Sequence, residues 1–145
     1  MHFFKRRKGI IGFDFSVHTD MPVIKQKAQL NDNLSLSFYF ANNGIPLYPN
    51  CRGGFDCLND EYLNAFPKRT YIALGVHGFV RLKEQQLEWR LWMNQIVNKS
   101  ETVGFVVVGH LPKDIVETYE KVVKFSFFDS FIEERRNKET KSHVN

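Results

Sequence analysis

Polar and ionisable residues follow four of the apolar segments in this sequence, at positions where buried strands would end. In chain order they are Asp14, Ser16, Asn50, Arg52, His77 and His110. The carboxyl ends of parallel strands meet at one edge of a sheet, and ligands bind there. The sequence therefore predicts a pocket built from these side chains, although polar residues also occur wherever a strand emerges into a loop.

The residue types indicate what such a pocket would do. His77 or His110 would serve as a general acid or base, because imidazole titrates near neutral pH. Asp14 would orient an imidazole or hold a metal, and Arg52 would hold a phosphate or carboxylate through two parallel hydrogen bonds. The candidate catalytic residues are therefore Asp14, His77 and His110, and the candidate ligand-binding residues are Ser16, Asn50 and Arg52.

These residues need elements to position them, and apolar runs alternate with helical patterns as in βαβ units. Strands are expected at residues 8–15, 45–49, 71–76, 103–108 and 122–127, with helices or helical turns between and after them. The predicted fold is a single α/β domain, with a mostly parallel sheet of four to five strands and helices on both faces. Residues 1–9 would form a basic arm, 10–134 the domain and 135–145 a flexible charged tail.

Several local patterns make this outline more specific. Asp20 is expected to cap a helix whose first turn contains Pro22. Residues 34–41 fit a strand or a helix, and helix is favoured, with a break near 31–33. Two prolines place the strand at 45–49 at an edge or make it irregular, whereas residues 103–108 are apolar enough for the centre. One helical face should carry the apolar residues Leu87, Leu91, Trp92 and Ile96.

Composition limits the class of protein. The chain has 145 residues, 43% of them hydrophobic, which is typical of one globular domain and excludes a disordered or collagen-like chain. The net charge of +4 arises from the uninterrupted run Lys5, Arg6, Arg7 and Lys8, since the other 16 basic residues balance 16 acidic ones. Such an arm would contact nucleic acid, or would simply be solvated.

Other functional classes lack their signatures. The sequence shows no secretory signal and no apolar run long enough to span a membrane, so we expect a cytoplasmic protein. Cys51 and Cys57 have no further ligands at zinc spacing, and two free thiols are expected, with a disulfide as the alternative. No phosphate-binding loop or nucleophile elbow is present. No cofactor is therefore predicted, and the sequence does not decide whether the protein is an enzyme.

One segment resembles a known family. Residues 13–22, Phe-Asp-Phe-Ser-Val-His-Thr-Asp-Met-Pro, are similar to a signature of an uncharacterised bacterial and phage family, the domain of unknown function numbered 4417. Residues 43–49, 71–78, 103–109 and 123–131 resemble its later segments in the same order. Phe13 and His18 depart from the family's usual Pro and Tyr, and we expect this protein to lack the family's long N-terminal segment. The resemblance implies an α/β fold and a bacterial or mobile-element setting, without an activity.

Three functions follow as hypotheses. The first is an accessory interaction protein of a phage or mobile element, which would bind a host protein or a second copy of itself through exposed apolar surface. The second is a ligand-binding protein or enzyme that acts on a phosphate-bearing or nucleotide substrate at the strand ends. The third is nucleic-acid binding through Lys5, Arg6, Arg7 and Lys8. No contact with a membrane is expected.

Overall fold

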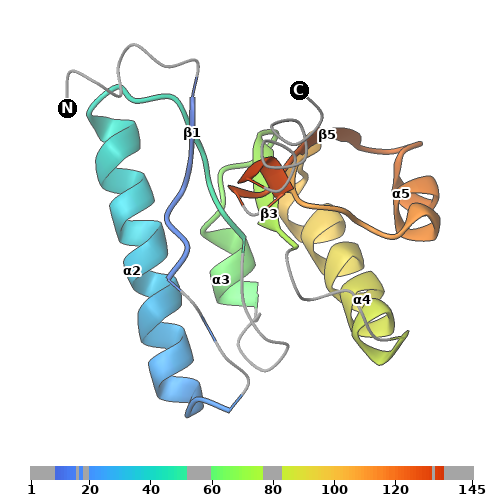
Figure 1. Ribbon diagram of the computed structural model, residues 1–145. Helices are drawn as coiled ribbons and strands as arrows, with labels where there is room; N and C mark the ends of the chain where they lie inside the picture. Colours follow the sequence, from blue (N-terminus) through green and yellow to red (C-terminus); the bar gives the residue numbers. More distant parts are fainter. Residues whose placement is uncertain are drawn as a thin grey trace.

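The computed structural model describes residues 9–15, 17, 20–51, 60–76, 83–131 and 133–135, and five strands alternate with four helices along them (Figure 1). The elements are β1 (Ile10–Ile11), α2 (Val23–Asn42), β2 (Leu47–Tyr48), α3 (Asp60–Asn64), β3 (Tyr71–Gly75), α4 (Lys83–Ser100), β4 (Gly104–Val108), α5 (Lys113–Tyr119) and β5 (Lys124–Phe128). The predicted α/β class is confirmed. None of the described helices is long and apolar enough to cross a membrane.

All strand pairs are parallel. β1 pairs with β2, and β3, β4 and β5 form a second group in that order. A parallel bridge between Asn50 and Ala73 joins the two groups, with the Cys51 amide donating to the Ala73 carbonyl and the Ala73 amide to that of Pro49. The five strands therefore lie in the order of the sequence, and β4 is flanked on both sides, as its apolar composition predicts.

The hydrophobic core lies between one face of this sheet and the helices. Side chains alternate between the two faces of a strand, and the buried alternate residues of β3 and β4 point to the helical side. They are Ile72, Leu74, Phe105 and Val107. Each helix contributes buried residues to the same cluster, which contains Leu30 of α2, Leu63 of α3, Met93 of α4 and Ile115 of α5. The four described helices thus pack on one face.

The expectation of helices on both faces is therefore not met by the described helices. A right-handed connection between parallel strands places its helix on a fixed side, as long as each new strand is added in the same direction. Helices reach both faces only when the strand order reverses, and the order β1-β2-β3-β4-β5 contains no reversal. In Figure 1 the helices accordingly follow one another in an arc around the strands.

Helix α2 covers the ambiguous segment in one unbroken run. Residues 34–41 are helical, as favoured, and the break near 31–33 is absent. Pro22 occupies the N-cap position in place of Asp20, and its carbonyl accepts hydrogen bonds from the amides of Lys25 and Gln26. The helix ends at Asn42, where Gly44 adopts a φ of 72°, a value that a residue without a Cβ reaches without strain.

The second strand is irregular but lies inside the sheet. Its paired length is only Leu47–Tyr48, because Pro46 and Pro49 have no amide hydrogen to donate. The prediction of an irregular strand is confirmed, whereas the alternative of an edge position is wrong. Pairing resumes at Asn50, so that β2 still connects β1 to β3.

Helix α4 turns a different face inward from the one expected. Leu87 and Leu91 are 62% and 55% exposed, while Trp92 and Ile96 are buried. The buried residues follow helical spacing as Trp89, Trp92, Met93 and Ile96. The rings of the two tryptophans meet edge to face with centroids 4.5 Å apart, and both belong to the core cluster.

Two glycines lie beneath tyrosine rings on the side of the sheet away from the helices. A Cβ on Gly104 would lie 2.5 Å from Tyr71 Cε1 and 2.8 Å from the Lys124 carbonyl oxygen. A Cβ on Gly9 would lie 2.9 Å from Tyr48 Cε2, with its other contacts at 3.5 Å or more. Gly104 thus permits close approach both of a ring and of backbone, whereas Gly9 makes space only for a movable ring.

We predict that Gly104→Ala destabilises the fold by about 1–3 kcal/mol, because the methyl group has to displace the backbone of β5. Gly9→Ala, the matched control, should have a smaller effect, since the Tyr48 ring can shift. Chemical denaturation of both variants measures the difference. Equal stability of the Gly104→Ala variant and the parent would contradict the packing described.

Candidate functional site

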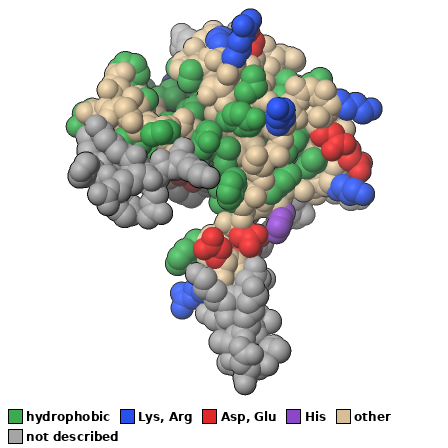
Figure 2. All heavy atoms as spheres, turned by 90° about the horizontal axis from the view of Figure 1, so that it is seen from above, with side chains coloured by type: hydrophobic (Ala, Val, Ile, Leu, Met, Phe, Trp, Pro, Cys, Tyr) green, Lys and Arg blue, Asp and Glu red, His purple; other side chains and the backbone are tan. Residues whose placement is uncertain are grey.

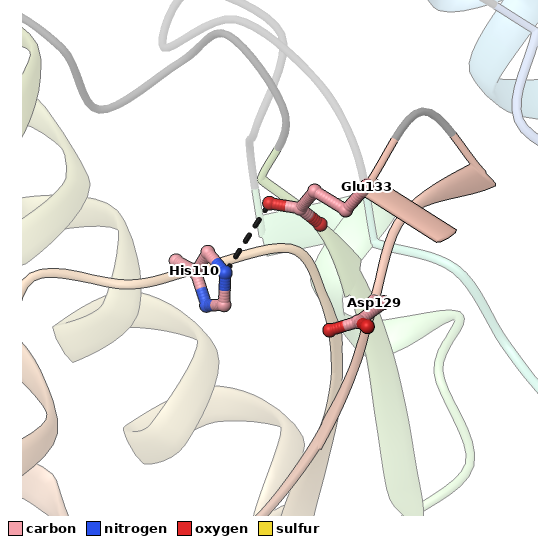
Figure 3. Close-up of side chains that lie close together, drawn as sticks. All are labelled: His110, Asp129 and Glu133. Carbon is pink, nitrogen blue, oxygen red and sulfur yellow. Dashed lines mark ion pairs between the residues drawn. The ribbon is translucent and has the colours of Figure 1, made fainter. Parts of the chain in front are cut away.

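Three side chains that offer metal ligands meet beyond the carboxyl ends of β4 and β5. His110 follows β4, and Asp129 and Glu133 follow β5 (Figure 3). One ligand atom from each lies within 4.8 Å of those of the other two. We call these three residues the edge cluster.

The pairing of β4 with β5 brings the edge cluster together. Val108 lies opposite Phe128 in the register, and the next amide, of Gly109, donates to the Phe128 carbonyl at 2.9 Å. Gly109 has a φ of 104°, which lets the chain turn immediately after this bond. His110 therefore leaves β4 beside the point where Asp129 leaves β5.

A capping box holds the third member. The Ser130 amide donates to Glu133 Oε2 at 2.7 Å, and the Glu133 amide approaches Ser130 Oγ at 3.4 Å. This reciprocal pair is a common start for a helical turn. It leaves Glu133 Oε1 directed at His110, whose Nε2 lies 3.3 Å away.

The exposure of the cluster makes a purely structural role weak. The His110 side chain is 74% exposed and that of Glu133 is 26% exposed. An ion pair so accessible to water stabilises a fold by about 0–1 kcal/mol. Imidazole and carboxylate ligands suit several divalent cations, and three protein ligands leave coordination positions open for water or a bound molecule.

Of the six residues predicted at strand ends, three lie in the described part of the chain. His110 belongs to the edge cluster, whereas Asp14 is exposed beyond β1 and is separated from β4 by β2 and β3. Asn50 is buried at 5% exposure, and its Oδ1 accepts no hydrogen bond from any residue that the structure describes. Outside the described residues lie Ser16, Arg52, His77, Lys5, Arg6, Arg7 and Lys8.

Sequence reasoning missed Asp129 and Glu133, although signals for both exist. Asp129 directly follows the fifth strand, so the rule applied to the first four strands would have selected it. Glu133 stands three residues after Ser130, which is the spacing of a capping box. That spacing predicts that the Glu133 carboxylate accepts a hydrogen bond from the Ser130 amide. No local pattern predicts that this carboxylate faces His110.

The segment that contains Asp14 is fixed by a buried amide on α2. Asn33 is 2% exposed, and its Oδ1 accepts a hydrogen bond from the Phe15 amide at 2.8 Å. Its Nδ2 donates to the Phe15 carbonyl at 3.4 Å. One side chain thus satisfies both backbone groups of a residue beyond the end of β1, as the next strand would otherwise do.

We expect Asn33→Ala to lower the free energy of unfolding by about 1–3 kcal/mol, because it leaves these backbone groups without partners. Asn42→Ala, at an exposed position of the same helix, should change it by less than about 0.5 kcal/mol. Urea denaturation compares the two. If both substitutions behave alike, Asn33 does not hold this segment.

Cys51 follows the bridge that joins β2 to β3, and it is a buried free thiol. Burial raises the pKa of the Cys51 thiol well above its usual range. The thiolate is the reactive form, so this cysteine is not a nucleophile in the folded chain. Cys57 lies outside the described residues.

In a Cys57→Ala background, Ellman's reagent at pH 8 should react with Cys51 only after denaturation. Burial of the thiol also makes the free energy of unfolding depend on pH. The thiol of the unfolded chain ionises above about pH 8.5, whereas the buried thiol of the folded chain stays protonated there. The contribution of this thiol to stability is therefore complete below that pH and is lost as the pH rises. Rapid reaction of the folded chain would show that Cys51 is accessible.

Comparison with known proteins gives a family. A model described as Domain of unknown function (DUF4417) matches residues 1–126, well over half of the chain. The chain belongs to this family. None of the curated proteins and none of the solved structures that were compared matches it. The DUF4417 match confirms the resemblance seen in residues 13–22. It does not test the expectation that an N-terminal segment is missing.

Membership of the family gives no information about the function of the edge cluster. Its description names no activity, and the DUF4417 match includes His110 but ends before Asp129 and Glu133. The edge cluster is therefore argued from the geometry of this chain alone.

Proposed function

We propose that this protein binds a divalent cation at the edge cluster and uses it to capture an anionic, phosphate-bearing ligand. The observation that carries the proposal is the convergence of one imidazole and two carboxylates, with ligand atoms within 4.8 Å of one another. These side chains come from two separate strand ends, so sequence proximity alone does not explain their meeting.

The position in the fold supports the same function. Open parallel sheets bind ligands beyond the carboxyl ends of their strands, and the edge cluster lies beyond two of them. A cation held by His110, Asp129 and Glu133 would keep open positions directed at solvent. Phosphate oxygens are hard ligands that would complete its coordination. Of the residues expected to form a pocket at the strand ends, His110 belongs to this proposed cation site.

We predict that MnCl2 binds the full chain at a ratio of one ion to one chain in isothermal titration calorimetry. Asp129→Asn and His110→Ala should each weaken binding at least tenfold, because each removes one of three protein ligands. Glu134→Gln, which removes an exposed carboxylate next to the cluster, is the matched control and should bind Mn²⁺ like the parent.

Inorganic phosphate added to the Mn²⁺ complex then tests the second part of the proposal. Phosphate should bind only in the presence of the cation, and not to the Asp129→Asn variant. Absence of Mn²⁺ binding, or equal binding by all variants, would rule out the edge cluster. Cation binding without phosphate binding would rule out the anionic ligand.

Exposed apolar side chains support a second candidate, the protein-interaction module expected first from the sequence. On α2, Ile24, Phe38 and Tyr39 are 75%, 69% and 54% exposed. Figure 2 shows apolar side chains gathered over the middle of the surface seen from above, with the histidine beside acidic side chains at its border. Large exposed apolar side chains of this kind give a partner protein or a second copy a surface to bind.

If α2 mediates self-association, light scattering should give a mass above the 17.0 kDa of one chain, and Phe38→Ser should lower it. Phe131→Ser serves as the control for loss of an equally exposed ring elsewhere. A strict monomer at all accessible concentrations would contradict self-association through this helix.

A further inference from the structure

A groove crosses the face of the sheet that the described helices leave uncovered. It has a volume of about 450 Å³, within the range of small-molecule sites. Every strand of the sheet contributes to its lining, which consists of Gly9, Ile11, Tyr48, Tyr71, Val106, Ser126 and Phe128. We call it the sheet groove.

The register explains why these residues share a face. Ile11 pairs with Tyr48. Asn50, two residues after Tyr48 and therefore on the same face, pairs with Ala73. Ala73 in turn pairs with Val106, and Val106 pairs with Ser126. Parallel sheets are normally covered on both faces, yet Ile11 is 39% and Phe128 is 57% exposed. Accessible apolar surface of this kind is available to a ligand.

The aromatic lining is positioned by glycine. The Tyr71 ring lies over Gly104 and the Tyr48 ring over Gly9, so both rings lie across the sheet. The two rings meet nearly edge to face, at an interplanar angle of 81° and a centroid distance of 6.4 Å. They form an aromatic wall against which a further ring can pack in the same way.

The described residues of the lining offer hydrogen bonds and carry no charge. The hydroxyls of Tyr48, Tyr71 and Ser126 form no hydrogen bond with any residue that the structure describes. Asn50 stands two residues after Tyr48, on the same face by its pairing with Ala73. Its Oδ1 is one of two buried acceptors that have no hydrogen-bond partner among the described residues. Four polar side chains therefore lie in or near an apolar groove with unused hydrogen-bonding capacity.

This combination selects a class of ligand. An aliphatic chain would bury the hydroxyls without partners, which is unfavourable. An anion would find no cationic side chain among the described residues of the lining, since Lys124 shares the face by register but does not line the groove. A planar uncharged ring with hydrogen-bonding edges satisfies both conditions, because its faces pack on aromatic rings and its edges pair with hydroxyl and amide groups.

We propose that the sheet groove binds a planar heteroaromatic ring such as a purine. This inference does not depend on the cation at the edge cluster, because none of the edge-cluster residues lines the groove. The sheet groove would be a second binding site on the face of the sheet, separate from the edge cluster at its carboxyl edge.

Adenosine tests the proposal as an uncharged probe, titrated into the full chain in EDTA so that cation binding cannot contribute. Calorimetry should show binding at about 1 mM or tighter. Phe128→Ala should weaken it about fivefold or more through loss of ring packing. Phe131→Ala removes an exposed ring that does not line the groove and should leave it unchanged. Ser126→Trp, at an exposed position, should fill the groove and abolish binding.

Three results would overturn the proposal. The first is absence of adenosine binding at millimolar concentration. The second is binding that both Phe128→Ala and Ser126→Trp leave intact, which would place the ring elsewhere. The third is a dimer by light scattering that Ser126→Trp converts to a monomer, which would show that a second copy covers the groove. Because EDTA is present throughout, none of these results bears on the edge cluster.

Discussion

The parallel pairing of β4 with β5 is the interaction on which the candidate site depends. Five register pairs connect the two strands, from Gly104 with Lys124 to Val108 with Phe128. The hydrogen bond from the Gly109 amide to Phe128 extends the pairing to the strand ends. A shift of one residue would send alternate side chains to the opposite face, and it would separate His110 from the two carboxylates. Phe105 of β4 faces the helices, and Phe125 of β5, its register partner, packs against the same core cluster. A slip of one residue would turn Phe125 away from that cluster.

The sequential strand order determines what surrounds that pair. Because each connecting helix returns on the same side, the helices and the main hydrophobic cluster lie on one face of the sheet. The other face carries Ala73, Val106 and the two tyrosines. Gly104 and Ala73 keep the centre of the uncovered face shallow, while Tyr48 and Tyr71 lie across it. The fold thus presents a polar edge that can hold a cation and an apolar face that can pack a ring, on separate residues.

Much of this architecture is visible in the sequence. The five strand segments, the helix over residues 34–41 and the central position of 103–108 follow from local patterns of hydrophobicity. Local patterns do not predict which face of the sheet the helices cover, because this depends on the order of the strands, which is a long-range property. The buried face of α4 was also misjudged: Leu87 and Leu91 fit helical spacing with Trp92, but the better-packed set runs through Trp89 and Met93. At the site, the strand-end rule identifies His110, whereas its partnership with Glu133 requires both the β4–β5 register and a capping box.

The position of a bound paramagnetic ion tests the central claim most directly. Substoichiometric Mn²⁺ broadens the NMR signals of nearby amides, so an ¹H–¹⁵N spectrum of the full chain locates it. The account predicts selective loss of the signals from residues 109–111 together with those from 129–134, with the amides of α2 unaffected. Loss confined to one of these two segments, or centred elsewhere in the chain, would contradict a site shared by the ends of β4 and β5.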